Sequence, residues 1–302
     1  MKIQTFSIVA GSRACDGRCP FCVSRMTGFE ELPKHIHHVN VRNLNKAIKL
    51  AELGGCTTTL ITGKGEPTLY PNEVDLYLHR LRNTSIPFVE LQTNALQIGR
   101  LARDGISSLH LSWLRCWYEN GLDTIAISIV GVTQKENAQV YHEDYPPLAR
   151  TVEFLHEKGF SVRLCLMMQK GMVDSESKLE EVINFCKTHE VEQLTARPIR
   201  TPTTLVSPPA DDYFKYTAKH GLTDTEVNDI TQHVIEEGTL LMRLMHGAEV
   251  YDYEGQNICL SDCLTVVPDN DNIRTLIFYA NGRISYDWQH KGAVLLGGQR
   301  TS

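Results

Sequence analysis

The chain has 302 residues, 42% of them hydrophobic and 22% charged, with a formal net charge of −6. These values are typical of one large globular domain with an extension, or of two ordinary domains, and they exclude extensive disorder and fibrous repeats. The acidic charge disfavours a nucleic-acid partner, because proteins that bind nucleic acids usually present a basic stripe.

Short β-branched or apolar runs alternate with stretches of helical periodicity up to about residue 200, which predicts repeated βα units around a parallel sheet. The predicted strands are Thr5–Ala10, Thr58–Thr62, Phe88–Thr93, Thr124–Val130, Ser161–Met168 and Gln193–Pro198. The predicted helices are Leu44–Leu53, Asn72–Arg82, Ser107–Asn120, Leu148–Lys158 and Lys178–His189, three of them followed by glycine. Right-handed crossovers between these units predict an α/β fold, an open (β/α)6 partial TIM barrel, over residues 1–200.

The pattern changes after Arg200. A proline-rich loop precedes a helical pattern at Asp224–Glu237, and the helical pattern continues over residues 240–245. Alternating residues then flank Asn281-Gly282, which predicts a hairpin. We therefore expect residues 201–302 to form a C-terminal α+β extension that caps the barrel and contributes to the substrate site.

The cysteines indicate metal binding more than disulfides. Their number is nine, which is odd, and residues Met1–Gly11 lack the long apolar stretch of a signal peptide. No apolar run is long enough to cross a bilayer. We therefore expect a cytoplasmic protein without a membrane partner. Four single cysteines lie among apolar neighbours and are interpreted as small buried side chains: Cys56, Cys116, Cys165 and Cys186.

Three cysteines, Cys15, Cys19 and Cys22, follow the first predicted strand. Loops at the carboxyl ends of barrel strands carry the chemistry of such folds. Three thiolates on a four-iron cube leave one iron open for a ligand. A structural zinc site is the alternative, although zinc usually takes four protein ligands.

Further motifs follow the next strands in order. The triplet has the spacing Cys-x₃-Cys-x₂-Cys with Phe21 before its last cysteine. Gly63-Lys64-Gly65-Glu66-Pro67 follows the second strand, Gln92-Thr93-Asn94-Ala95 the third, and Ser128 lies in the fourth. Together these motifs resemble those of the radical S-adenosylmethionine (radical SAM) enzymes. Lys64 and Ala95 depart from the family pattern, since glycine is usual at both places.

The resemblance implies a [4Fe–4S] cluster on Cys15, Cys19 and Cys22, whose open iron binds S-adenosylmethionine. The residues implied to bind that cofactor are Gly63, Gly65, Glu66, Asn94, Ser128 and Arg197. The two glycines permit close approach of the backbone to the cofactor's amino group. Glu66 can instead be a solvated turn residue, pair with Lys64 or brace its loop. Asn94 and Ser128 can instead cap strand ends. Arg197 can pair with a carboxylate of cofactor or substrate, or be an ordinary exposed arginine.

The implied activity is reductive cleavage of S-adenosylmethionine to a 5′-deoxyadenosyl radical that abstracts hydrogen from a small metabolite, nucleotide or peptide. It implies oxygen sensitivity and a reducing electron donor such as flavodoxin or ferredoxin. Two alternatives stay open on the residues alone: an iron–sulfur electron-transfer or sensor protein, and a zinc-stapled binding module.

Cys259 and Cys263 lie near a segment that resembles the terminal region of the molybdenum-cofactor cyclase. Relatives with a second cluster carry a further cysteine after an Asp-Gly or Asn-Gly turn, but residues 284–288 here contain none. A second cluster would need ligands such as Asp262, Asp287 or His290. Free thiols, or a zinc site that uses His290, are the alternatives.

Overall fold

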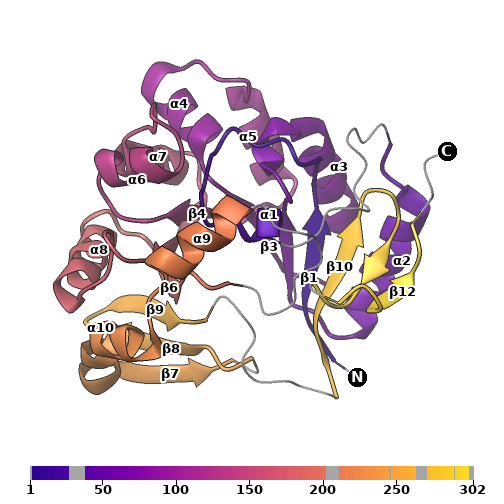
Figure 1. Cartoon of the computed structure of the whole chain (residues 1–302). Helices are drawn as coiled ribbons and strands as arrows, with labels where there is room; N and C mark the ends of the chain where they lie inside the picture. Colours follow the sequence, from indigo (N-terminus) through magenta and orange to yellow (C-terminus); the bar gives the residue numbers. More distant parts are fainter. Residues whose placement is uncertain are drawn as a thin grey trace.

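The computed structural model describes residues 2–26, 38–201, 211–244, 246–262, 271–288 and 290–298. One 12-stranded sheet organises them (Figure 1). Across the sheet, the strands are β12 (Val294–Leu296), β11 (Ile284–Ser285), β10 (Ile273–Tyr279), β1 (Ile3–Val9), β2 (Thr58–Thr62), β3 (Phe88–Thr93), β4 (Thr124–Ile129), β5 (Ser161–Met168), β6 (Gln193–Pro198), β9 (Gln256–Leu260), β8 (Glu249–Tyr253) and β7 (Thr239–Arg243).

Strands β1 to β6 run parallel in sequence order, and each pairs with the next. The six predicted strands are confirmed, with small differences at the ends of β1 and β4. The sheet is not closed, because β12 and β7 lie at its two ends. The fold is therefore the expected open barrel, extended by further strands.

Alternation along the strands gives the sheet two different faces. In β5, Val162 and Leu164 are buried in the main hydrophobic core, which also holds helix residues such as Leu155 and Leu179. Arg163 lies on the opposite face, toward the inside of the barrel. Polar side chains on this inner face are available for a site.

The helices are α1 (Val23–Met26), α2 (Val41–Leu53), the 3₁₀ turn η1 (Pro67–Leu69), α3 (Pro71–Leu81), α4 (Leu96–Asp104), α5 (Leu111–Glu119), α6 (Gln134–Val140), α7 (Leu148–Glu157), α8 (Glu176–Thr188), α9 (Asp211–His220) and α10 (Asp224–Glu237). Most of them surround the sheet on its outer side, whereas α1 and α9 lie in front of the barrel strands (Figure 1). Gly55, Gly121 and Gly159 follow their helices with φ of 72°, 91° and 89°, as expected for left-handed helix ends. None of the helices in the described ranges is long and apolar enough to cross a membrane.

The sequence analysis placed one helix with wrong bounds and missed another. The helix predicted at Ser107–Asn120 spans only Leu111–Glu119, and α4 was not predicted. The cause lies at the start of α4, where Ala95 takes a left-handed conformation that alanine rarely adopts and that local propensity does not predict. The helix at Asp224–Glu237 is confirmed, with a Thr223–Glu226 capping box.

The C-terminal third contributes strands at both ends of the sheet. β9 pairs parallel with β6, and β10 pairs parallel with β1. The hairpin around Asn281-Gly282 is confirmed, since β10 and β11 pair antiparallel. Within 240–245, the helical expectation was wrong for the described residues, because Thr239–Arg243 pairs antiparallel with β8. Extra strands therefore flank the six-stranded barrel on both sides.

Candidate functional site

The cysteine loop leaves the carboxyl end of β1 and is fixed at its start. Gly11 has φ of 70°, and its N–H donates to Glu73 Oε2 at 2.9 Å. The Ser12 and Tyr70 hydroxyls lie 2.6 Å apart. These contacts join the loop to α3, so the first cysteine begins from a rigid position.

The three cysteines are free and lie close together. A Cβ placed on Gly17 would lie 3.6 Å from Cys15 Sγ and 3.7 Å from Cys19 Sγ, so glycine leaves room between these two sulfurs. Cys22 ends the loop, and its N–H donates to the carbonyl of Cys19. Burial raises the pKa of the Cys19 thiol well above its ordinary value, and the neighbouring Cys22 and Cys15 add to that shift.

The three thiolates fit an iron–sulfur cube by their chemistry. Thiolates are soft ligands that suit iron–sulfur clusters and zinc alike. In a cube each thiolate binds a different iron, so three thiolates can hold the cube and leave its fourth iron open. Cys15, Cys19 and Cys22 would hold such a cluster.

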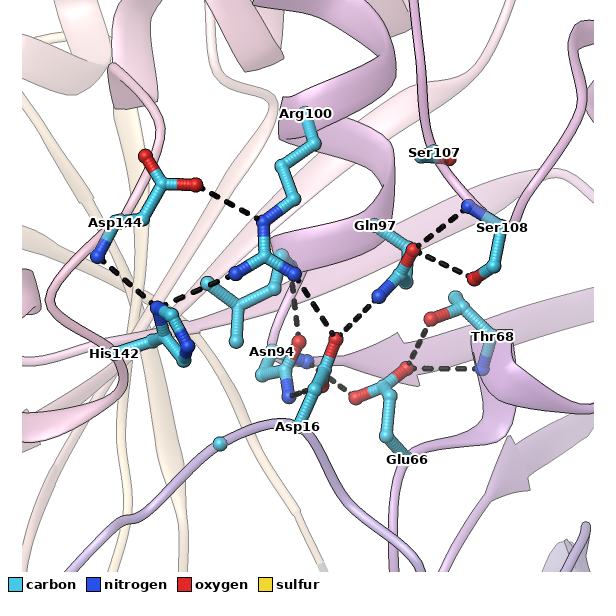
Figure 2. A network of polar contacts seen from close by, with 12 residues as sticks. Asp16, Glu66, Thr68, Asn94, Gln97, Arg100, Ser107, Ser108, His142 and Asp144 are labelled. Atoms are coloured by element: carbon cyan, nitrogen blue, oxygen red, sulfur yellow. Dashed lines mark hydrogen bonds and ion pairs between the residues drawn. The ribbon is translucent and has the colours of Figure 1, made fainter.

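Asp16, between the first two cysteines, ties the loop to the barrel (Figure 2). Asn94 Nδ2 donates to Asp16 Oδ1 at 2.9 Å, and Gln97 Nε2 donates to Asp16 Oδ2 at 2.6 Å. Arg100 lies 3.8 Å from the same carboxylate. In turn, Gln97 Oε1 accepts from the Ser108 hydroxyl at 2.7 Å. The loop is thus braced against the first turns of α4.

The same network continues to the segment after α6. Arg100 Nε donates to Asp144 Oδ2 at 3.3 Å, and an Arg100 amino group lies 3.2 Å from His142 Nδ1. Arg103 pairs with Asp144 at 2.7 Å. Beyond these residues, the Arg18 N–H donates to the carbonyl of Tyr141. Two separate segments therefore hold the cysteine loop in place.

Glu66 is buried and acts as a brace. Its Oε1 accepts from the Thr68 N–H at 2.9 Å, the Thr68 hydroxyl at 2.8 Å and the Thr93 hydroxyl at 2.6 Å. Its Oε2 accepts from the Asn94 N–H at 2.9 Å. Burial raises the pKa of this carboxyl, and the four donors oppose that rise. Bracing, one of the two roles expected for Glu66, is confirmed; direct cofactor contact stays a prediction.

Close backbone packing explains both predicted glycines. A Cβ on Gly65 would meet the carbonyl oxygen of Ala14 at 2.1 Å, and one on Gly63 would meet that of Gly65 at 2.8 Å. The Glu66 N–H donates to Ala14 at 2.9 Å. These glycines bring the second motif directly against the cysteine loop. Their approach to a cofactor stays a prediction.

Asn94 joins the third motif to the first. Besides its bond to Asp16, its Nδ2 lies 3.7 Å from Cys15 Sγ, and its Oδ1 accepts from the Leu96 N–H at 2.9 Å. The latter bond is the strand-end cap considered above. Ala95 follows with φ of 59°, the conformation for which the family pattern has glycine.

Ser128 and Arg197 lie on the inner face at a distance from this network. Ser128 is half-buried on β4, beside Cys165 of β5, and its hydroxyl makes no hydrogen bond within the described part of the chain. Arg197 is half-buried near the end of β6, and its Nε is buried without a hydrogen-bond partner. In the described part of the chain, neither residue forms a hydrogen bond with Cys15, Cys19 or Cys22, and their predicted roles toward the cofactor stay predictions.

Of the C-terminal cysteine pair, the structure describes only Cys259. Cys259 is half-buried on β9 beside Thr195 of β6, and burial raises the pKa of its thiol. Cys263 lies outside the described residues. Of the other suggested ligands, Asp262 accepts from Arg200 at 3.2 Å, and Asp287 contacts His290 at 2.8 Å.

The C-terminal third also covers the end of the cysteine loop. Figure 1 shows α9 crossing in front of α1. The Phe21 and Tyr216 rings are 6.4 Å apart, and the Thr217 hydroxyl lies 3.8 Å from Met26 Sδ. The aromatic residue of the triplet therefore packs against a helix from the second part of the chain.

The sequence analysis missed Asp16, Gln97 and Arg100 as parts of the site. Asp16 carried one signal, its place inside the triplet. Gln97 and Arg100 are three residues apart, a spacing that puts both side chains on one side of a helix, but α4 was not predicted.

Comparisons with known proteins agree with this geometry. The family model for the Radical SAM superfamily matches residues 9–186, more than half of the chain, so the chain belongs to the radical SAM superfamily. Membership implies a [4Fe–4S] cluster and S-adenosylmethionine as cofactors and makes the protein an enzyme. No curated protein sequence matches it.

Solved structures show the same fold. Streptococcus suis SuiB bound to S-adenosylmethionine is 14% identical over 99% of this chain and 63% of its own, with a TM-score of 0.60. SuiB bound to the precursor peptide SuiA is 16% identical over 99% of this chain and 62% of its own, with a TM-score of 0.59. The anSMEcpe structure with bound AdoMet is 12% identical over 98% of this chain and 74% of its own, with a TM-score of 0.60. The chain thus spans less than two thirds of the length of SuiB.

Proposed function

We propose that the protein cleaves S-adenosylmethionine reductively and uses the resulting radical on a small metabolite, nucleotide or peptide. In this proposal, Cys15, Cys19 and Cys22 hold the cluster. Once bound there, the cluster supplies the electron that splits the sulfonium into methionine and a 5′-deoxyadenosyl radical. The chain's own task is to bind the cofactor, exclude water and position the substrate C–H bond.

One observation carries the proposal: three motifs that are distant in sequence are hydrogen-bonded to each other. Asn94 donates to Asp16 of the cysteine loop, and Glu66 accepts from Asn94 while its own N–H donates to Ala14. A simple electron carrier needs the cysteine loop but has no use for this joint bracing of three strand ends. The bracing supports a cofactor site beside the open iron.

We also propose the division of labour expected from the sequence. Residues 1–200 form the radical SAM barrel, and residues 201–302 cap it and contribute to the substrate site. Support comes from β9 and β10, which border the barrel, and from α9, which packs on the cysteine loop. A peptide is one candidate substrate, since SuiB binds a precursor peptide.

Anaerobic reconstitution tests the proposal. We expect iron and sulfide in the ratio of a four-iron cluster, and 5′-deoxyadenosine release that depends on dithionite. A protein that binds zinc and releases no 5′-deoxyadenosine contradicts the proposal. The same preparation of a variant with alanine at Cys15, Cys19 and Cys22 should retain almost no iron; substantial residual iron and sulfide would reveal a second centre.

A further inference from the structure

Two tyrosines, Tyr141 and Tyr145, are buried beside the cysteine loop, directly after α6. Their exposed fractions are 2% and 1%, and their ring centroids are 5.8 Å apart. Neither hydroxyl has a hydrogen-bond partner among the residues that the structure describes. Buried tyrosine hydroxyls usually have a partner, so two unpaired ones side by side indicate that an acceptor from outside the chain belongs there.

Another buried tyrosine shows the usual arrangement. The Tyr77 side chain is fully buried, and its hydroxyl donates to Glu73 Oε2 at 3.3 Å. A buried hydroxyl that lacks such a bond has lost its hydrogen bonds to water without compensation, which is unfavourable. Tyr141 and Tyr145 therefore differ from Tyr77 in that the described part of the chain supplies them with no acceptor.

Both tyrosines pack against the cysteine loop. They form a small buried cluster with aliphatic side chains such as Val130, and Cys19 and Phe21 of the loop pack against this cluster. The carbonyl of Tyr141 also accepts from the N–H of Arg18 in the loop at 2.8 Å. Burial raises the pKa of both phenols, and the neighbouring Cys19 adds to that shift. The unpaired hydroxyls are thus close to a sulfur that would bind the cluster.

The segment that carries the two tyrosines is fixed to α4. Arg100 contacts both His142 and Asp144 (Figure 2). Arg103 also pairs with Asp144 at 2.7 Å. These contacts lie between the two tyrosines in sequence, so they hold both ends of the segment. Donors that are held in place in advance need little rearrangement to bond an acceptor.

We propose that the hydroxyls of Tyr141 and Tyr145 donate hydrogen bonds to sulfur atoms of the cluster and thereby raise its reduction potential. The inference rests on the proposed function, because it requires the cluster on the cysteine loop. Hydrogen bonds to cluster sulfurs make reduction easier, since they stabilise the additional negative charge of the reduced cluster. A phenol suits this role, because its ordinary pKa near 10 keeps the proton on the oxygen at neutral pH.

The test is a redox titration of the reconstituted protein, followed by electron paramagnetic resonance, first without S-adenosylmethionine. The double variant Tyr141→Phe/Tyr145→Phe keeps both rings and removes both hydroxyls. At a fixed potential, we expect its ratio of reduced to oxidised cluster to be about threefold lower or more, and the single variants to divide this effect. Tyr118→Phe, at an exposed tyrosine on α5, is the control and should leave the ratio unchanged.

Thermal unfolding of the cluster-free protein detects a purely structural role. Without the cluster, the double variant should unfold at the same temperature as the native protein or higher, because it no longer buries unpaired hydroxyls. A lower midpoint would mean that the hydroxyls are satisfied within the protein, and it would overturn the proposal.

Three further results would overturn it. One is an unchanged reduction potential in a double variant with full iron content. Another is loss of cluster iron from that variant, because the hydroxyls would then be needed to assemble the site. The third is a shift in potential that occurs only after S-adenosylmethionine is added, because the hydroxyls would then bind that cofactor. Release of 5′-deoxyadenosine by the native protein reports on the proposed function separately.

Discussion

Two parts of the barrel interior differ in how their polar side chains are held. Around the cysteine loop, at the ends of β1 to β3, Asp16, Glu66 and Asn94 are hydrogen-bonded to one another's segments; we call this part the prepared side. On the inner face of β5 and β6, Thr195 Oγ1 and Arg197 Nε are buried without a hydrogen-bond partner among the described residues. The difference shows that the protein's own hydrogen bonds join three sequence motifs on the prepared side, whereas no such network joins these two residues.

Removal of one cysteine should have the largest effect on the prepared side. Cys19→Ala should abolish both cluster iron and 5′-deoxyadenosine release, since two thiolates cannot hold the cube that three hold. Iron and sulfide analysis after anaerobic reconstitution measures this. Cys116→Ala, which removes a half-buried thiol on α5, should retain full iron content. If Cys19→Ala still released 5′-deoxyadenosine, the ligand assignment would be wrong.

The next largest effect should come from the brace at Glu66. Glu66→Gln replaces an acceptor of four hydrogen bonds with an amide whose NH₂ faces donors, so the variant should lose about 2–4 kcal/mol of unfolding free energy. Denaturant unfolding measures the loss. The exposed Glu119→Gln should change it by less than about 0.5 kcal/mol. Equal stability of the two variants would show that bracing at Glu66 is unimportant.

Much of the prepared side could be predicted from the sequence, because strands and motifs follow from local pattern. The six central strands and the order of the motifs rest on alternation and turn residues over short stretches. The Asp16–Gln97–Arg100 network could not be predicted, since it depends on α4, whose first turn follows the left-handed Ala95.

A substitution at Asp16 should destabilise the prepared side less than one at Glu66. Asp16→Asn keeps the side chain's shape but removes the charge that faces Arg100, so the unfolding free energy should fall by about 1 kcal/mol. A loosened loop should also lose cluster iron to a chelator faster than the native protein. Asp104→Asn, at an exposed carboxylate that pairs with Arg103, is the control. Unchanged iron loss in Asp16→Asn would show that α4 does not steady the cysteines.

His246, in the turn between β7 and β8, predicts a dependence of stability on pH. Its pKa falls from the ordinary 6.5 to about 4, so between these values the unfolded chain binds a proton that the folded chain excludes. Stability should therefore decrease as the pH falls from 6.5 to 4, and His246→Gln should lessen that decrease. Thermal unfolding across this range provides the measurement. Identical pH profiles for the two proteins would contradict the lowered pKa of His246.

The smallest effect is expected at Ala95, where the family pattern has glycine. Its φ of 59° is a left-handed conformation that costs an alanine about 1–2 kcal/mol, while glycine adds about 0.4–1 kcal/mol of unfolded-state entropy. Ala95→Gly should therefore raise the unfolding free energy by up to about 1 kcal/mol. Glu190→Gly, at φ of 53° outside the site, is a matched control for the backbone effect. A similar gain in both variants, with unchanged iron content, means that alanine only strains the turn. Loss of iron in Ala95→Gly alone would mean that alanine, rather than glycine, helps Asn94 hold the cysteine loop.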